Sequence, residues 1–239
     1  MYNLQFKTET FGGEIPFIDS QHVRWVRGGI TIDKGEVTAV DGKKKLKAGA
    51  FVGKIANGKY APYVPAVASS KVIGDPAEDV NKAVKYTAIK SGEDGDNIKI
   101  QHKDPGEDAD LSVDVIGGAD GITTIVVTLE YDTDAVVSTA AEVAAAVNNH
   151  YLARTLVVAD VSINEDDEGA GVVAVAAATA LEDGADANIG NAVILGVDVD
   201  VTDNDGVATA LDHGRVIVER LPAAPDAYIK SLLPGVVWK

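Results

Sequence analysis

The sequence predicts a mainly β fold that is interrupted by a small inserted α+β domain. Val and Ala dominate a hydrophobic fraction of 46%, aromatic residues reach only 5%, and 24 glycines are present. This composition favours short strands and tight turns over a helical bundle. Apolar residues alternate over short segments, and one clear helical pattern lies in the middle of the chain. With 239 residues, the chain is long enough for two modest domains that each bury a core.

Residues 1–22 are predicted to form an N-terminal arm. Their apolar residues are spread among Gly12, Gly13 and Pro16 and follow neither a strand nor a helix period. Apolar side chains on a segment without its own core favour docking onto another surface, and the alternative is that the arm folds back onto its own domain. The candidate contact residues of the arm are Leu4, Phe6, Phe11, Ile15 and Phe17.

Residues 23–78 are predicted to contain short strands of a β-barrel or β-sandwich. The pattern alternates from Val23 and breaks at glycine-containing turns, with a hairpin turn expected at Asp41–Gly42. A basic cluster follows this turn, and we interpret it either as a contact surface for an acidic partner or as a solvated turn. Its members are Lys43, Lys44, Lys45 and Lys47.

Residues 79–186 are predicted to form the inserted α+β domain. Four strand candidates lie between residues 84 and 129, and Thr139 and Glu142 have the spacing of a helix capping box. A further strand, an acidic loop and a last apolar segment follow the helix. The residues expected on one face of that helix are Ala140, Val143, Ala144, Val147 and Tyr151.

Residues 187–239 return to the strand pattern of the first part of the chain. Alternation over residues 192–202 and over 214–221 predicts two strands, and the proline-containing tail predicts a loop with a turn of helix. Residues 23–78 and 187–239 are therefore predicted to form one discontinuous domain.

The net charge of −16 is concentrated in the predicted insert. Residues 79–186 carry 6 Lys and Arg against 22 Asp and Glu, whereas the counts are 11 against 8 for residues 1–78 and 4 against 7 for residues 187–239. We expect the insert to project into solvent, and strong negative charge argues against a nucleic-acid partner. The alternative is that the acidic loops only maintain solubility.

The sequence predicts no catalytic, cofactor or metal site. The absence of cysteine excludes disulfides, thiolate catalysis and thiolate metal ligands, and no phosphate-binding loop, nucleophile elbow or zinc-protease motif occurs. No apolar run has the length of a membrane span, and the N-terminus lacks a signal-peptide pattern, so no membrane partner is expected. The four histidines, which are expected to be surface or capping residues, are His22, His102, His150 and His213.

One acidic segment resembles a calcium loop at first sight. Asp200, Asp203 and Asp205 lie close together, but an EF-hand register places Val201 at the first ligand position and no Glu closes the loop. A solvated turn is the favoured interpretation, and weak Ca²⁺ binding is the alternative.

Three ordered motifs in the flanking segments resemble the phage lambda head decoration protein D family. Lys47–Ile55 carries a Gly-x-hydrophobic-hydrophobic-Gly strand, Gly58–Pro62 carries a Gly-Lys-Tyr-x-Pro turn, and Ala192–Asp205 carries a strand followed by an acidic turn. The resemblance covers about half of the chain, and the region before Lys47 departs from it. It implies a β-tulip-like decoration domain.

The inserted segment resembles a small repeat domain of phage tail sheath and other virion proteins. Five motifs match in order over about 100 residues, with Asp96 standing where that pattern often has Gly. They are Tyr86–Ala88 with Gly92, Asp96–Ile100, Leu111–Val115, Thr139–Asn148 and Leu181–Asp186.

These resemblances imply a structural, non-enzymatic protein that decorates the outer surface of a phage capsid. The expected partners are the major capsid protein, bound through the arm, and two further copies of the chain in a homotrimer at the three-fold sites of the shell. The protein would be made in the host cytoplasm and end in the virion. One alternative is a displayed module that binds a host-surface ligand, although only Tyr86, Tyr131 and Tyr151 offer aromatic rings in the insert. A tail- or sheath-associated virion protein is the other.

Overall fold

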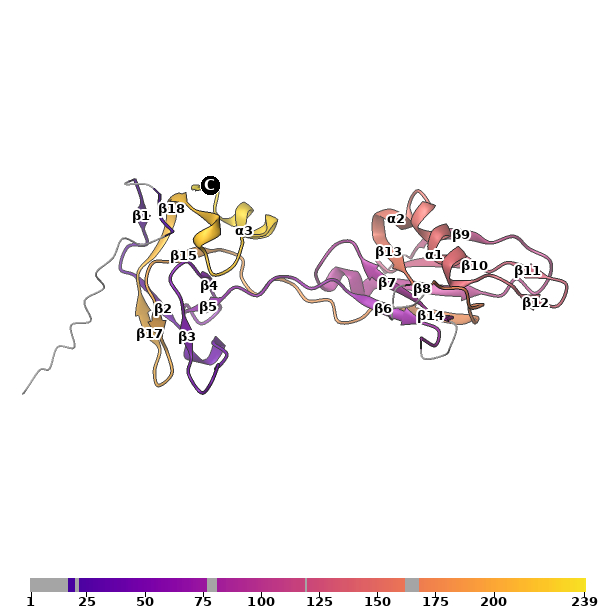
Figure 1. Ribbon diagram of the computed structural model, residues 1–239, viewed down its shortest axis with the longest axis horizontal. Helices are drawn as coiled ribbons and strands as arrows, with labels where there is room; N and C mark the ends of the chain where they lie inside the picture. Colours follow the sequence, from indigo (N-terminus) through magenta and orange to yellow (C-terminus); the bar gives the residue numbers. More distant parts are fainter. Residues whose placement is uncertain (1–16, 20–21, 77–80, 119, 162–167) are drawn as a thin grey trace, which may run out of the picture. The chain divides into compact units, whose positions relative to one another are not determined.

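The computed structural model describes residues 17–19, 22–76, 81–118, 120–161 and 168–239, and these residues form a mainly β fold (Figure 1). The chain divides into two compact units. Unit 1 combines Met1–Val64 with Asn188–Lys239, and unit 2 consists of Pro65–Ala187. Unit 1 is therefore discontinuous in sequence, and the segment that interrupts it forms a compact unit of its own.

The inserted segment begins earlier than the sequence predicts, at Pro65 instead of residue 79. The reason is a hairpin: β6 (Ser70–Ile73) pairs antiparallel with β7 (Val84–Ala88), so β6 already belongs to the insert. The predicted end at residue 186 lies one residue before the observed end at Ala187.

Unit 1 is built on an eight-stranded sheet in the order β1-β18-β15-β4-β5-β2-β17, with β19 beside β18. No pairing among the described residues joins β1 to β17, so these strands do not close into the barrel that the sequence predicts as one option. The strands are β1 (Arg24–Trp25), β2 (Ile30–Ile32), β4 (Phe51–Lys54), β5 (Tyr60–Pro62), β15 (Val193–Leu195), β17 (Gly206–Ala208), β18 (Ala210–Val216) and β19 (Val236–Trp238). A separate pair joins β3 (Lys45–Leu46) to β16 (Val199–Asp200), and the helical elements are η1 (Lys34–Glu36), η3 (Val218–Arg220) and α3 (Ala227–Leu232).

The centre of this sheet is buried on both faces. Along β15, Ile194 packs into one cluster with Leu211 of β18, while Val193 and Leu195 pack into another with Ala210. This alternation is the period of two that a strand imposes on its side chains. The predicted strand over residues 214–221 is wrong in its bounds, because β18 starts at Ala210 and the chain turns into η3 after Val216.

Unit 2 has a single apolar core, to which two sheets and helix α1 contribute side chains. A four-stranded sheet has the order β14-β8-β10-β9, and a three-stranded sheet has the order β13-β7-β6 with α1 packed against β7 and β13 (Figure 1). The additional elements are β8 (Ile98–Lys103), β9 (Ser112–Gly117), β10 (Thr123–Thr128), β11 (Tyr131–Asp132), β12 (Ala135–Val136), β13 (Val157–Asp160), β14 (Ala176–Ala180), η2 (Glu93–Asn97), α1 (Ala140–Asn149) and α2 (Ala153–Leu156).

The predicted capping box at the start of α1 is confirmed. The Thr139 hydroxyl accepts from the backbone N–H of Glu142, and the Glu142 carboxylate accepts from the backbone N–H of Thr139. Four of the five residues predicted for the inner face are buried, but Tyr151 is 68% exposed. The helix ends at Asn149 and His150 is extended, so Tyr151 leaves the helical register.

Within the described residues, no helix is long and apolar enough to cross a membrane.

Candidate functional site: the arm root and the charged loops of unit 1

The last part of the predicted arm is fixed to β18. Ile18 forms an antiparallel bridge with Val216, the N–H of Ile217 donates to the carbonyl of Phe17, and the N–H of Asp19 donates to the carbonyl of Arg215. Phe17 is only 1% exposed and belongs to the core of unit 1. Its side chain is therefore part of the fold and is not available to a partner surface, which corrects the prediction for this residue. The other predicted arm contacts, Leu4, Phe6, Phe11 and Ile15, lie outside the described residues.

The C-terminus meets the same stretch of β18. The N–H of Lys239 donates to the carbonyl of Val216, and the N–H of Val218 donates to the carbonyl of Lys239. The Lys239 ammonium also donates to the Asp19 carboxylate at 2.8 Å, and this bond is the main cause that lowers the pKa of Asp19. The arm root and the C-terminal strand are thus tied to β18 and to each other.

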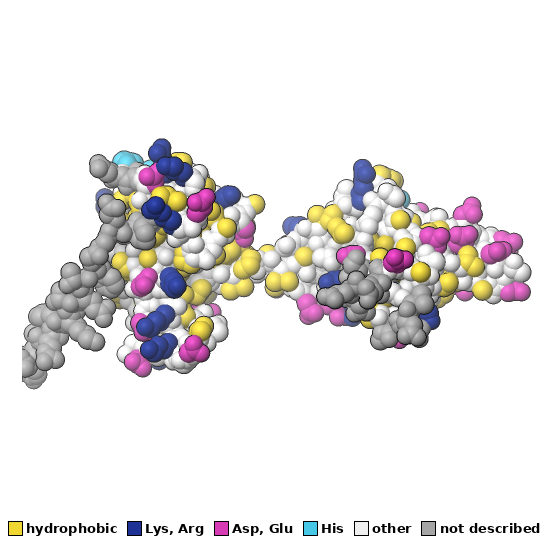
Figure 2. Space-filling model, in the orientation of Figure 1, with side chains coloured by type: hydrophobic (Ala, Val, Ile, Leu, Met, Phe, Trp, Pro, Cys, Tyr) yellow, Lys and Arg dark blue, Asp and Glu magenta, His cyan; other side chains and the backbone are white. Residues whose placement is uncertain are grey.

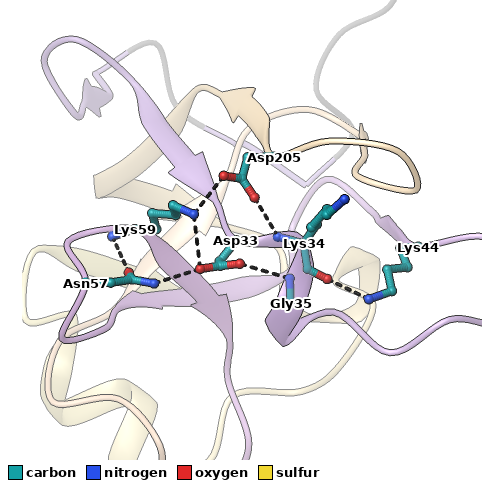
Figure 3. A network of polar contacts seen from close by, with 7 residues as sticks. All are labelled: Asp33, Lys34, Gly35, Lys44, Asn57, Lys59 and Asp205. Atoms are coloured by element: carbon teal, nitrogen blue, oxygen red, sulfur yellow. Dashed lines mark hydrogen bonds and ion pairs between the residues drawn. The ribbon is translucent and has the colours of Figure 1, made fainter.

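A network of charged and polar side chains joins three loops of unit 1 (Figure 3). Lys59 lies between two carboxylates, at 2.8 Å from Asp205 and 3.4 Å from Asp33. Asp33 also accepts from the side-chain amide of Asn57 and from the backbone N–H of Gly35. These donors lower the pKa of Asp33, the backbone N–H of Gly35 most strongly, while the bond to Asp205 raises the pKa of Lys59.

The same network engages part of the predicted basic cluster. The Lys44 ammonium donates to the carbonyl of Lys34 (Figure 3). The Lys34 ammonium donates to the carbonyl of Asp203. Lys45 forms an ion pair with Asp200 at 3.4 Å. Lys43 lines a surface hollow beside the acidic turn. The basic cluster and the acidic turn therefore lie beside each other and share one ion pair, between Lys45 and Asp200, which sequence spacing does not reveal.

The acidic turn resembles a hydrogen-bonded loop more than a calcium site. Asp205 accepts from the backbone N–H of Lys34 as well as from Lys59, and Asp200 accepts from the backbone N–H of Thr202. These carboxylates therefore already take part in hydrogen bonds and ion pairs within the fold. Across the described part of the chain, no group of three or more His, Cys, Asp or Glu side chains is arranged to hold a metal ion.

The histidines occupy three different environments. His150 caps the end of α1, and its Nδ1 accepts from the backbone N–H of Ala153. The His22 and His213 rings lie edge to face with centroids 5.3 Å apart, next to the arm root. His102 is buried in unit 2, where it contacts the hydroxyl of Tyr86 at 2.8 Å.

The burial of Tyr86 removes it from the aromatic rings that the sequence offers for a sugar site in the insert. Tyr151 is exposed and Tyr131 is half-buried. The ring platform available to a carbohydrate on unit 2 is therefore smaller than the sequence indicates.

Several motif residues of the insert have structural roles at its chain ends. The Asp186 carboxylate accepts from the backbone N–H of Glu93, and the Asp96 carboxylate accepts from that of Gly184. Gly92 has a φ of +116°, which disfavours any side chain. These contacts bring the motif around Gly92 to the motif that ends at Asp186.

The three flanking motifs come together in the centre of the unit 1 sheet. The strand of Lys47–Ile55 is β4, the turn of Gly58–Pro62 leads into β5, and the strand of Ala192–Asp205 starts as β15. These strands are direct neighbours in the order β15-β4-β5. A Cβ at Gly53 would lie 2.3 Å from the carbonyl oxygen of Asn191, so the second glycine of the first motif permits the close approach of the two segments.

In comparisons with known proteins, no family model, no curated protein and no solved structure matches this chain. The candidate site therefore rests on its own geometry: an anchored arm root, a charge-balanced group of loops and a separate acidic unit.

Proposed function

We propose that this protein is a capsid decoration protein that binds the outside of a phage head and stabilises the expanded shell. The observation that carries the proposal is the assembly of β15, β4 and β5. Three motifs that resemble the lambda decoration family occupy adjacent strands of one sheet, although more than 120 residues of insert separate the third motif from the first two. In this proposal unit 1 is a β-tulip-like decoration domain that sits as a trimer at three-fold sites on the major capsid protein.

The division of charge between the units supports this arrangement. Unit 1 carries 14 Lys and Arg against 13 Asp and Glu, a balance of +1, whereas unit 2 carries 7 against 24, a balance of −17. On the face drawn in Figure 2, basic and acidic side chains are interspersed over unit 1, and acidic ones predominate over unit 2. A nearly neutral unit suits attachment to a protein lattice, and a strongly acidic one suits display, because like charges on neighbouring virions repel.

The arm provides the attachment. Phe17 packs in the core and Ile18 pairs with β18, so a partner bound by residues 1–16 would be attached to the folded part of unit 1. An extended segment adds a strand to an exposed sheet edge of the partner, with alternate side chains in pockets. Because the protein would bind the assembled lattice and not its dissociated subunits, its binding free energy adds to the stability of the shell.

Cosedimentation with empty capsids tests the proposal. Purified protein should bind expanded capsids saturably and leave unexpanded proheads unbound. A variant that lacks residues 1–15 retains the Phe17 anchor and should lose binding while keeping the tryptophan fluorescence of unit 1. Equal occupancy by the truncated and complete chains would remove the arm from the proposal, and no binding by the complete chain would remove the decoration role.

Exposed apolar side chains on a sheet favour a ligand-binding role for unit 2 as the second candidate. On β13, Val157 and Ala159 face the core while Val158 points outward, and Ile89 after β7 is similarly half-exposed. Helix α1 packs against the face of this sheet that carries Val157 and Ala159. A Val158→Lys variant that keeps full capsid occupancy but lowers adsorption of phage to host cells would support this role, and unchanged adsorption would argue against it.

A further inference from the structure

The two chain segments that join unit 1 and unit 2 are pinned to each other at three successive points. The first is Val64 with Asn188, the second Val67 with Ala185, and the third Ser70 with Glu182. Each step is three residues long on both segments. The entering and leaving chains therefore have equal lengths and a constant antiparallel register.

On the unit 1 side, Asn188 holds the first point. Its side-chain oxygen accepts from the N–H of Val64 at 2.8 Å, and its side-chain nitrogen donates to the carbonyl of Pro62 at 2.8 Å. Its own N–H also donates to the carbonyl of Val64 at 3.4 Å. Asn188 thus bonds three backbone groups of Pro62 and Val64, where the chain leaves unit 1.

Helix α3 secures the same place on unit 1. The Tyr63 hydroxyl donates to Asp226, the N-cap of α3, and the Tyr228 hydroxyl donates to the carbonyl of Ile189. The two tyrosine rings stack with centroids 6.3 Å apart. Both ends of the interruption in unit 1 are therefore fixed by contacts within unit 1.

On the unit 2 side, the two segments are joined by backbone hydrogen bonds instead of by the side chain of Asn188. Val67 and Ala185 exchange two N–H to carbonyl bonds of 2.8 and 3.1 Å, and Ser70 and Glu182 exchange bonds of 2.9 and 3.1 Å. The Asp186 carboxylate accepts from the backbone N–H of Glu93 at 3.1 Å. These contacts close unit 2 on itself at its own chain ends.

We infer that unit 2 is a closed cassette, and that the position between Val64 and Asn188 is an insertion site for a folded domain whose chain ends are adjacent. Each unit keeps its chain ends together by its own hydrogen bonds, so neither needs the other to complete its fold. The boundary between the two folding units falls between Val64 and Val67 on entry and between Asp186 and Asn188 on exit. This inference does not depend on a capsid partner.

Two substitutions that lie two residues apart test this boundary in the complete chain. Both tryptophans, Trp25 and Trp238, belong to unit 1, so tryptophan fluorescence reports unit 1 alone, while far-ultraviolet circular dichroism reports both units. Asn188→Ala should lower the denaturation midpoint of unit 1, which fluorescence reports. The midpoint of unit 2, seen as the part of the dichroism change that fluorescence does not follow, should stay unchanged. Asp186→Ala should lower the denaturation midpoint of unit 2 and leave that of unit 1 unchanged. Either variant shifting both transitions together would overturn the inference.

Cross-linking tests the register independently. Because the chain has no cysteine, the double variant Val67→Cys/Ala185→Cys contains only the introduced pair. Both positions are exposed, and a directly paired antiparallel couple has a Cα separation that suits a disulfide. Mild oxidation should give a nearly complete intramolecular disulfide with unchanged tryptophan emission. The control Val67→Cys/Asp186→Cys is out of register by one residue and should cross-link at least tenfold more slowly, so equal rates in the two variants would also overturn the inference.

Discussion

The buried pair formed by Tyr86 and His102 predicts that unit 2 loses stability in mild acid. His102 on β8 is 1% exposed and Tyr86 on β7 is fully buried, with 2.8 Å between the hydroxyl oxygen and Nε2. The other ring nitrogen lies 3.4 Å from the carbonyl of Ala174. Tyr86 belongs to the apolar core cluster of unit 2.

Burial lowers the pKa of His102 below its ordinary value of 6.5, and the Ala174 carbonyl opposes this only partly. The unfolded chain therefore takes up this proton before the folded chain does. The stability that unit 2 gains from a neutral His102 is fully present above about pH 6.5. It is lost as the pH falls from there toward the pKa of His102 in the folded state. One such group gives a limiting slope of about 1.4 kcal/mol per pH unit, which is large beside a total stability of roughly 5–15 kcal/mol.

Denaturant titrations between pH 7.5 and pH 5 measure this slope. The dichroism transition of unit 2 should move with pH, and the slope should disappear in the variant Tyr86→Phe/His102→Phe, which removes both polar partners. His150→Gln is the matched control, because His150 lies in the same unit but caps a helix near the surface, and the slope should persist in it. A slope that survives the double substitution would refute the assignment to His102.

Three further substitutions test the packing of each unit. Phe17→Ala should lower the free energy of unfolding of unit 1 by about 3–5 kcal/mol, measured by tryptophan fluorescence, because it leaves a cavity in the core. Val207→Ala, at an exposed position, is the control, and an equally small effect of both substitutions would place Phe17 outside the core. Gly53→Ala should destabilise unit 1 by about 1–3 kcal/mol because its Cβ would meet Asn191 and Ile189, whereas Gly190→Ala has open space around it and should be neutral; similar effects would contradict the close approach of β4 to this segment. Thr139→Ala should cost unit 2 about 1 kcal/mol through the lost helix cap, seen by dichroism and not by tryptophan fluorescence, and an unchanged midpoint would contradict the capping box.

Local features of the fold were accessible from the sequence because their physical causes are local. The capping box of α1 depends on two residues three positions apart, and the buried face of that helix follows its period as far as Val147. The mainly β character and the acidic inserted segment follow from composition and charge in the same way.

Features that depend on distant segments were not accessible. Phe17 shows no period because the core cluster that it joins is built from distant segments, among them β4, β15, β18 and the C-terminal segment. The boundary predicted between residues 78 and 79 is wrong because β6, which precedes it, pairs with β7 and so belongs to the insert. The ion pair between Lys45 and Asp200 has the same origin, since it depends on the pairing of β3 with β16.

The thermal stability of phage heads tests the central proposal most directly. Expanded heads that contain DNA would be stripped of this protein, then saturated with purified chain, and the temperature of DNA release would be recorded by a fluorescent dye. The decoration role predicts that the release temperature rises with occupancy and reaches a plateau when the three-fold sites are full. An unchanged release temperature at full occupancy, or no occupancy at all, would contradict it.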